Sequence, residues 1–282
     1  MRTEATEMSP ELVNRTGPAR AVAFYAAIGL LTFGLVFVEW WPLTLPVVVW
    51  LPDTVVNDFL ADWVDQASIH RIHLMAKGLA HVLIASSLVV QFRRPVASEA
   101  PMWQVSAFFA MAISVNLLAG NTTEQVPLFI FVIFGLGILA GFLHPSSPLL
   151  KFPRPVDGRL LALTAVMAVP FGAYAIGQLG MQVDGVPADP HWTAVHYTFA
   201  AEIGFLLILL GFISSSGLTG RRTTIWMTGL AAVLMGSASV VYTDQSSTLG
   251  VGWGVSLVVW GLAFVGVGES RRHKISTTEE GA

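Results

Sequence analysis

The chain has 282 residues, of which 54% are hydrophobic and 12% are charged, and its formal net charge is −3. With a mean hydropathy of +0.66, this composition excludes a soluble globular protein and predicts an integral membrane protein with the lipid bilayer as its partner and no nucleic-acid partner. The chain has no cysteine, which excludes disulfides, iron–sulfur clusters, thiolate metal sites and covalently attached c-type haem.

After a polar tail over residues 1–20, apolar runs of about 19 to 24 residues recur along the chain, each long enough to cross a bilayer. They start near Ala21, Ile69, Met102, Pro127, Leu160, His191, Thr224 and Leu249. We therefore predict an all-α polytopic protein in which residues 21–268 form one bundle of eight transmembrane helices. A second tail over residues 269–282 follows this bundle.

The basic residues predict the orientation of the bundle. Eight crossings place all but two of the 15 Lys and Arg residues, Arg71 and Lys77, on the side of the two chain ends. By the positive-inside rule, this distribution predicts a multi-pass protein of the cell membrane with both termini cytoplasmic. On the outer side, apolar residues at helical spacing over 54–67 predict an amphipathic helix that lies on the membrane surface.

Eight helices also divide into two halves, 21–144 and 159–268, that would run in the same direction because four is even. His73 and His196 are 123 residues apart, a spacing that several other residue pairs share. We expect these two histidines to be equivalent if the halves are a true repeat. Glycines at helical spacing, Gly137 with Gly141 and Gly229 with Gly236, predict close contacts between helices.

The second apolar run carries four ionisable side chains in its first half. With the angle of His73 around the helix axis taken as zero, Lys77 lies at about 40°, His70 at about 60° and His81 at about 80°, so all four share one face. Ionisable groups are costly inside a membrane and face the protein interior or a watery cavity. This face is therefore a candidate site, although hydrogen-bonded packing residues would produce the same pattern.

Lys77 on the second run and Glu202 on the sixth lie at a similar predicted depth. Because a buried lysine without a partner tends to lose its charge, we predict that the two form an intramembrane ion pair. Such a pair serves either packing alone or the movement of a proton or another ion.

The histidines permit two kinds of cofactor site. Neutral imidazole is the commonest metal ligand and the usual axial ligand of membrane-bound haem b. His73 and His196 could ligate one haem, with His70, His81 and His191 nearby. Alternatively, His70, His73 and His196 could hold copper or zinc, with His191 as a further candidate ligand. Neither spacing is specific to one of these cofactors.

His70-Arg71, after a long first outer loop in an eight-helix chain, is similar to a feature of haem A synthases. The resemblance does not extend to that family's haem ligands, because the last apolar run has no histidine and the fourth has only His144, at its cytoplasmic end. The residue three before His70 is Ala67 where that family has glutamate. The sequence therefore assigns no family.

Three functions remain open. The protein binds haem or a transition metal at an outer-facing pocket, for electron transfer with a redox partner or for metal handling. Alternatively, it moves a proton, an ion or a small solute with Lys77 and Glu202, or it is an assembly subunit whose polar residues only specify packing. No enzymatic activity is assigned.

Overall fold

The computed structural model describes residues 17–38, 40–61, 67–121, 128–146, 148–150, 156–185 and 189–279. Within these ranges the chain is helical and contains no sheet, which confirms the all-α prediction. The α-helices are α2 (Pro18–Phe33), α3 (Leu45–Val48), α4 (Asp53–Leu60), α5 (Arg71–Arg93), α6 (Glu99–Leu118), α7 (Leu128–Leu143), α8 (Gly158–Val183), α9 (Pro190–Thr193), α10 (His196–Ser214), α11 (Arg221–Val241) and α12 (Gly250–Glu279). Shorter helical turns are η1 (Gly34–Val38), η2 (Trp41–Thr44), η3 (Ala67–His70), η4 (Pro95–Ala97) and η5 (Pro148–Leu150).

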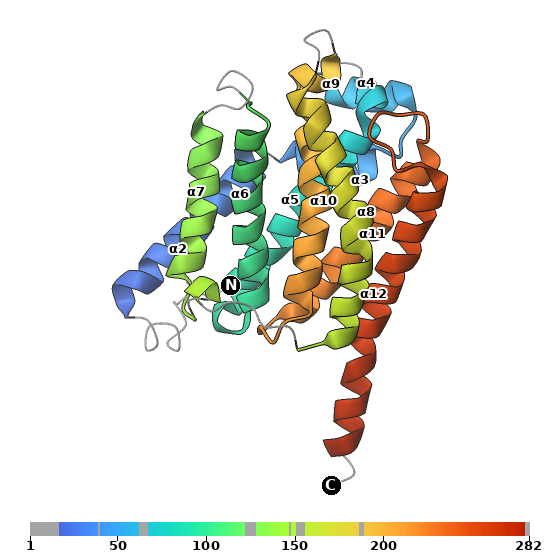
Figure 1. Ribbon diagram of the computed structural model, residues 1–282. Helices are drawn as coiled ribbons and strands as arrows, with labels where there is room; N and C mark the ends of the chain where they lie inside the picture. Colours follow the sequence, from blue (N-terminus) through green and yellow to red (C-terminus); the bar gives the residue numbers. More distant parts are fainter. Residues whose placement is uncertain are drawn as a thin grey trace, which may run out of the picture.

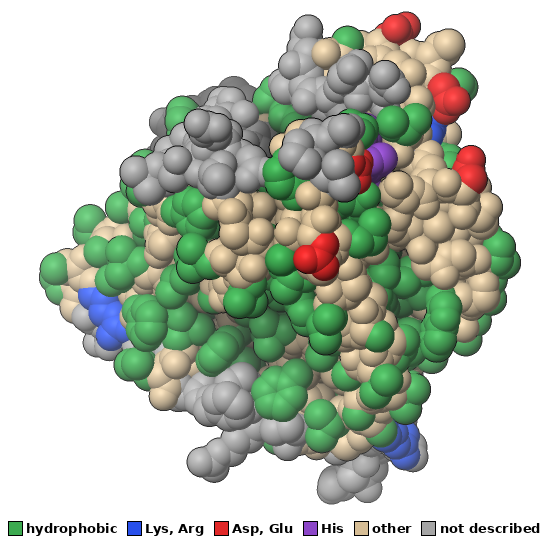
Figure 2. Space-filling model, turned by 45° about the horizontal axis from the view of Figure 1, so that its top comes forward, with side chains coloured by type: hydrophobic (Ala, Val, Ile, Leu, Met, Phe, Trp, Pro, Cys, Tyr) green, Lys and Arg blue, Asp and Glu red, His purple; other side chains and the backbone are tan. Residues whose placement is uncertain are grey.

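Seven of the described helices are long and apolar enough to cross a membrane: Pro18–Val36, Ala67–Arg93, Glu99–Leu118, Gly158–Val183, His196–Ser214, Arg221–Val241 and Gly250–Ser270. The fourth predicted span corresponds to α7, whose described apolar part, Ile130–Leu143, is shorter than these seven. In Figure 2, hydrophobic side chains are spread over the visible face of the molecule, and few charged side chains lie among them.

Helices α5 and α10 form the centre of the bundle. Helix α10 packs against α5, α6, α8 and α11, and α5 packs against α2, α6, α10 and α11. About two thirds of the apolar stretch of α5 and 72% of that of α10 are buried, against 28% for α8 and α12. Most side chains on α5 and α10 therefore face other helices rather than lipid.

Glycines set the closest helix contacts, as predicted. A side chain at Gly236 of α11 would meet the carbonyl oxygen of Gly254 of α12 at 2.6 Å, and one at Gly261 would meet that of Gly229 at 2.7 Å. The two backbones can approach this closely only because neither helix carries a Cβ atom there.

Helix α7 is held against both α6 and α2. A side chain at Gly137 of α7 would collide with the Phe109 ring of α6, so glycine permits this contact. At the other neighbour, the Arg20 guanidinium of α2 donates to the carbonyl oxygens of Phe142, Leu143 and His144, which have no partner within the helix. These contacts fix α7 along the edge of the bundle.

The short helices α4 and α9 cover one end of the bundle, and α2 begins and α12 ends at the opposite end (Figure 1). Helix α4 occupies the first part of the predicted surface helix over 54–67; residues 62–66 lie outside the described part. It buries Val56 and Leu60 and exposes Asp58, so it is amphipathic. Of the two predicted tails, residues 1–16 lie outside the described part and 269–279 continue α12.

Candidate metal centre

Four histidines come together at the end of the bundle that α4 and α9 cover. His70 is the last residue of η3 and precedes α5, His73 lies in the first turn of α5, His191 lies in α9, and His196 is the first residue of α10. Between α9 and α10, Val195 adopts a left-handed conformation with φ 52°, which is unusual for a β-branched residue. This turn separates α9 from α10 and keeps both histidines at the same end of the bundle.

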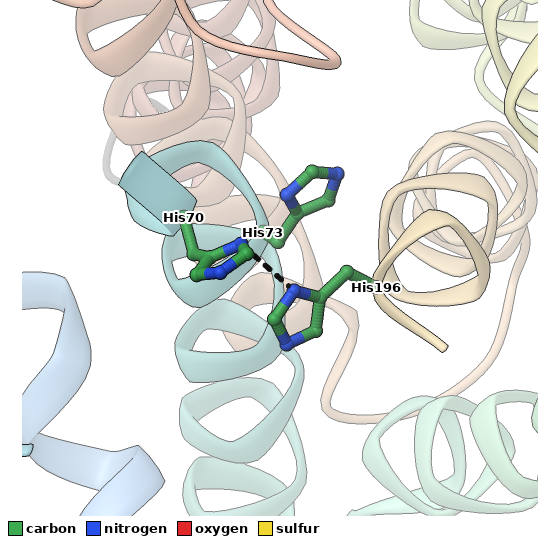
Figure 3. Close-up of side chains that lie close together, drawn as sticks. All are labelled: His70, His73 and His196. Atoms are coloured by element: carbon green, nitrogen blue, oxygen red, sulfur yellow. Dashed lines mark hydrogen bonds between the residues drawn. The ribbon is translucent and has the colours of Figure 1, made fainter. Parts of the chain in front are cut away.

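His70, His73 and His196 form a compact group. One ring nitrogen from each lies within 4.8 Å of those of the other two, and the three residues are 3%, 1% and 6% exposed. The Nδ1 atoms of His70 and His196 are 3.0 Å apart, and the two rings point toward each other from neighbouring helices (Figure 3). Two imidazole nitrogens approach this closely only when a proton or a cation lies between them.

His191 extends the group to four rings. Its ring centroid lies 4.4 Å from that of His70 and 5.1 Å from that of His73. Its Nε2 atom is buried and has no hydrogen-bond partner among the described residues. A buried polar atom without a partner is costly, so this nitrogen is a candidate ligand atom.

The hydrogen bonds of His73 determine which of its nitrogens is available. His73 Nε2 lies 2.7 Å from the Ser247 hydroxyl oxygen, and that hydroxyl donates its own proton to Gln178 Oε1. The serine oxygen must therefore accept a hydrogen bond from a protonated His73 Nε2, which leaves Nδ1 with a free lone pair. In the described part of the chain, Nδ1 is buried and has no partner.

Asp189 determines which ring nitrogen of His191 carries the proton, as Ser247 does for His73. Its carboxylate accepts hydrogen bonds from the His191 ring Nδ1 at 3.0 Å, the His191 backbone N–H at 2.9 Å and the Tyr197 hydroxyl at 2.9 Å. Burial alone would raise the pKa of Asp189, but these hydrogen bonds outweigh it and lower that pKa below its usual value. An ionised Asp189 holds the proton on His191 Nδ1, so Nε2 carries the lone pair.

The buried Arg71 side chain connects the segment before α4 and the segment after α11 to the start of α5. Its guanidinium donates to the backbone carbonyl oxygens of Val49 and Leu51, pairs with Asp53 at the start of α4, and lies over the Tyr242 ring at 4.9 Å. On the same side, Gln245 donates to the Ser68 carbonyl oxygen at 2.7 Å. The segments before α4 and after α11 are thereby tied to Ser68 of η3 and to Arg71, the first residue of α5.

These features fit a metal ion better than a haem. A transition metal bound by imidazoles lies about 2 Å from each nitrogen, so its ligand atoms are about 3–4 Å apart, and small ring movements bring this group to that spacing. The His73 and His196 rings are only 5.4 Å apart and stacked, with the His70 ring 4.4 Å from that of His196. The geometry gives no support to a haem between His73 and His196.

The remaining predicted residues lie elsewhere on the same helices. His81 is two turns further along α5, where its Nδ1 bonds to the Lys77 carbonyl oxygen at 2.8 Å. Lys77 and Glu202 line one cavity; the Lys77 ammonium lies over the rings of Trp41 and Phe199, and Glu202 accepts a hydrogen bond from Asn116. Their ion pair stays a prediction. His144 lies at the other end of the bundle, at the end of α7, next to Phe24.

The sequence analysis did not identify the residues that orient the histidines. Ser247 lies in the loop between α11 and α12, and Gln178 lies on α8, so only folding brings them to His73. Asp189 is different, because it lies two residues before His191 and its spacing could have indicated a partner for that ring. No protein-family model, curated protein sequence or solved structure matches this chain, so its function has to be argued from the site.

Proposed function

We propose that this integral membrane protein binds one divalent transition-metal ion through His70, His73 and His196, with His191 as a fourth ligand. The observation that carries the proposal is the convergence of three buried histidine nitrogens within 4.8 Å. Two further facts support it: the unpartnered Nδ1 of His73 and the unpartnered Nε2 of His191 are both buried. Each is the nitrogen that its neighbour's hydrogen bonds keep deprotonated.

The ligand set indicates zinc or copper. Imidazole nitrogen suits both ions, whereas magnesium and calcium prefer oxygen ligands, and the chain has no cysteine to supply a thiolate. The hydrogen bond between His73 and Ser247 and the one between His191 and Asp189 are of the kind that orients metal-binding histidines. The role that follows is metal handling; with copper the site would also permit electron transfer to a partner protein.

The topology that we propose has eight crossings, with α7 as the short one, and places the metal centre on the outer side. An even number of crossings is supported by the arrangement in Figure 1, in which α2 begins and α12 ends at the end opposite α9. The basic residues Arg20, Arg221 and Arg222 are at that opposite end, next to the ends of α2, α7 and α11. The positive-inside rule makes that end cytoplasmic.

Elemental analysis of the detergent-purified protein, after incubation with Zn²⁺ or Cu²⁺ and removal of free metal, tests the function. We expect about one ion per chain for wild type. We also expect His73→Ala and His196→Ala each to weaken binding by at least about a hundredfold, because each removes a ligand. Substitution with Co²⁺ adds a visible absorption spectrum that reports the ligand geometry.

His144→Ala is the matched control, since it removes a buried histidine at the other end of the bundle. It should bind metal like wild type. Equal metal content in His73→Ala, His196→Ala and wild type would overturn the proposal, provided that the variants elute as folded monodisperse protein.

A further inference from the structure

A cavity of about 250 Å³ lies next to the metal centre, further along α5 and α10. Its walls come from two peripheral helices, α2 and α7, and three inner ones, α5, α6 and α10. Apolar side chains make up most of the lining, including Leu31, Ile84, Phe108, Ile133 and Phe134. A concave apolar site with a few polar groups is the usual form of a small-molecule site.

The polar groups of this cavity are Lys77, His81, Asn116 and Glu202. Asn116 donates hydrogen bonds to the Glu202 carboxyl group at 3.1 Å and to the Ala112 carbonyl oxygen at 2.8 Å. Among the described residues, no other group donates a hydrogen bond to Glu202, although Glu202 is only 6% exposed. Its second carboxyl oxygen therefore remains available to a bound molecule.

Lys77 and Glu202 together restrict which head group the bound molecule can carry. An anionic head group would be attracted by Lys77 but repelled by a carboxylate at Glu202, and a cationic head group would meet the reverse. A neutral head group that carries both a hydrogen-bond acceptor for Lys77 and a hydrogen-bond donor for Glu202 satisfies both side chains. Two hydroxyl groups on one ring have this property, because each hydroxyl can donate and accept a hydrogen bond.

Size and access narrow the choice further. A volume of about 250 Å³ is just below the roughly 300–1,000 Å³ of typical ligand sites, so it suits a single substituted ring and not a whole lipid. Helix α2 exposes Leu30 and Phe33, and α7 exposes Val132, on faces that would contact lipid. The wall also includes η1, a π-helical turn, which is a feature frequent at functional sites.

We propose that this cavity binds the ring of a lipid-soluble quinol, with one ring hydroxyl oxygen accepting a hydrogen bond from Lys77 and the other ring hydroxyl donating to Glu202. The apolar tail of such a molecule would lie toward the lipid-facing helices α2 and α7. The site is separate from the metal centre, because none of the four clustered histidines lines it. The proposal therefore stands whether or not the histidines bind a metal.

Photoaffinity labelling of the protein in lipid nanodiscs, with an azido derivative of a one-isoprene ubiquinol, tests the proposal. We expect labelled peptides from α2, α5 or α10, and competition by unlabelled one-isoprene ubiquinol. Gly34→Leu should reduce labelling by about tenfold, because Gly34 lines the cavity and a side chain there meets nothing within 4 Å. Gly29→Leu is the matched control, since it has the same open surroundings outside the cavity lining and should label normally.

Glu202→Gln, which keeps the shape of the side chain but removes the charged acceptor, should weaken competition by the quinol about tenfold and give a second readout if Gly34→Leu does not fold. His73→Ala should label like wild type, which separates this site from the metal centre. Equal labelling of Gly34→Leu and Gly29→Leu, or unchanged competition in Glu202→Gln, would overturn the proposal. Equal competition by decanoate or decyltrimethylammonium would also overturn it, because the occupant would then be a charged amphiphile.

Discussion

The histidine cluster and the neighbouring cavity both include residues of α5 and α10, at successive depths along these helices. They differ in the spacing of their polar atoms and in the apolar area that surrounds them. In the cluster, three nitrogens lie within 4.8 Å of one another, and Ser247 and Asp189 accept hydrogen bonds that orient the His73 and His191 rings. In the cavity, about 250 Å³ is lined mainly by apolar side chains, and its polar groups are Lys77, His81, Asn116 and Glu202. The cluster suits a metal ion, and the cavity suits a small, mainly apolar organic molecule.

This difference shows that an ionisable residue in a membrane helix does not reveal its role by its face alone. His73 and Lys77 are one turn apart on α5, but one faces Ser247 and the other faces two aromatic rings. What separates them is depth along the helix, about 6 Å for four residues. Substitutions that affect one site and leave the other intact would sharpen the comparison.

The largest expected effect concerns the charges of the cavity. We expect Lys77→Met to lower the free energy of unfolding by about 3 kcal/mol, because it leaves the buried Glu202 without a compensating positive charge nearby. The double variant Lys77→Met, Glu202→Leu should lose less, since it removes both charges. Unfolding in detergent at neutral pH, followed by circular dichroism, measures both values.

If the double variant is no more stable than Lys77→Met, the predicted ion pair is wrong. Metal content provides the contrast between the two sites. Both variants should bind Zn²⁺ like wild type, because Lys77 and Glu202 are not among the clustered nitrogens.

A smaller effect is expected for Ser247→Ala. Without the serine oxygen, nothing holds the proton on His73 Nε2, so the tautomer with a free Nδ1 loses its advantage. We expect metal affinity to fall by about 10- to 100-fold, with photoaffinity labelling by the quinol derivative unchanged. Ser256→Ala, on the exposed face of α12, is the control and should bind metal normally. Unchanged affinity in Ser247→Ala would mean that this serine does not position His73.

The smallest effect is expected for Asp189→Asn, which keeps the acceptor for the His191 backbone but removes the negative charge. Metal affinity should fall by about tenfold, because His191 is then less firmly oriented. Titration with Zn²⁺ measures this loss, and the exposed Asp184→Asn is the control. A loss as large as that of His73→Ala would instead indicate that Asp189 is itself a ligand.

The same variant has a predictable dependence on pH. Because the pKa of Asp189 is lower in the folded protein than in the unfolded chain, its charge stabilises the fold above about pH 4, and that stabilisation disappears as the pH falls through the lowered pKa. The difference in unfolding free energy between wild type and Asp189→Asn should be constant from pH 6 to 8 and decrease below about pH 4. A difference that grows on acidification would contradict this assignment.

The sequence alone indicated the all-helical membrane fold and included the three clustered histidines among its candidate ligands. Runs of about 20 apolar residues can only be helices in lipid, because every backbone polar group must be satisfied within the segment. The cost of burying histidines in such a run made His70, His73 and His196 candidates for one site. Helical geometry placed His70 and His73 on one face, since three residues are close to one turn.

Only the tertiary structure decided which residues of that face act together. His81 shares the face with His73 but lies about 12 Å further along the axis, too far for one metal ion. Ser247 and Gln178 come from a loop and from α8, and no local pattern connects them to His73. Helical periodicity specifies an angle around one axis, whereas a metal centre requires atoms from several helices at the same depth, and only the packing of α5, α9 and α10 sets that depth.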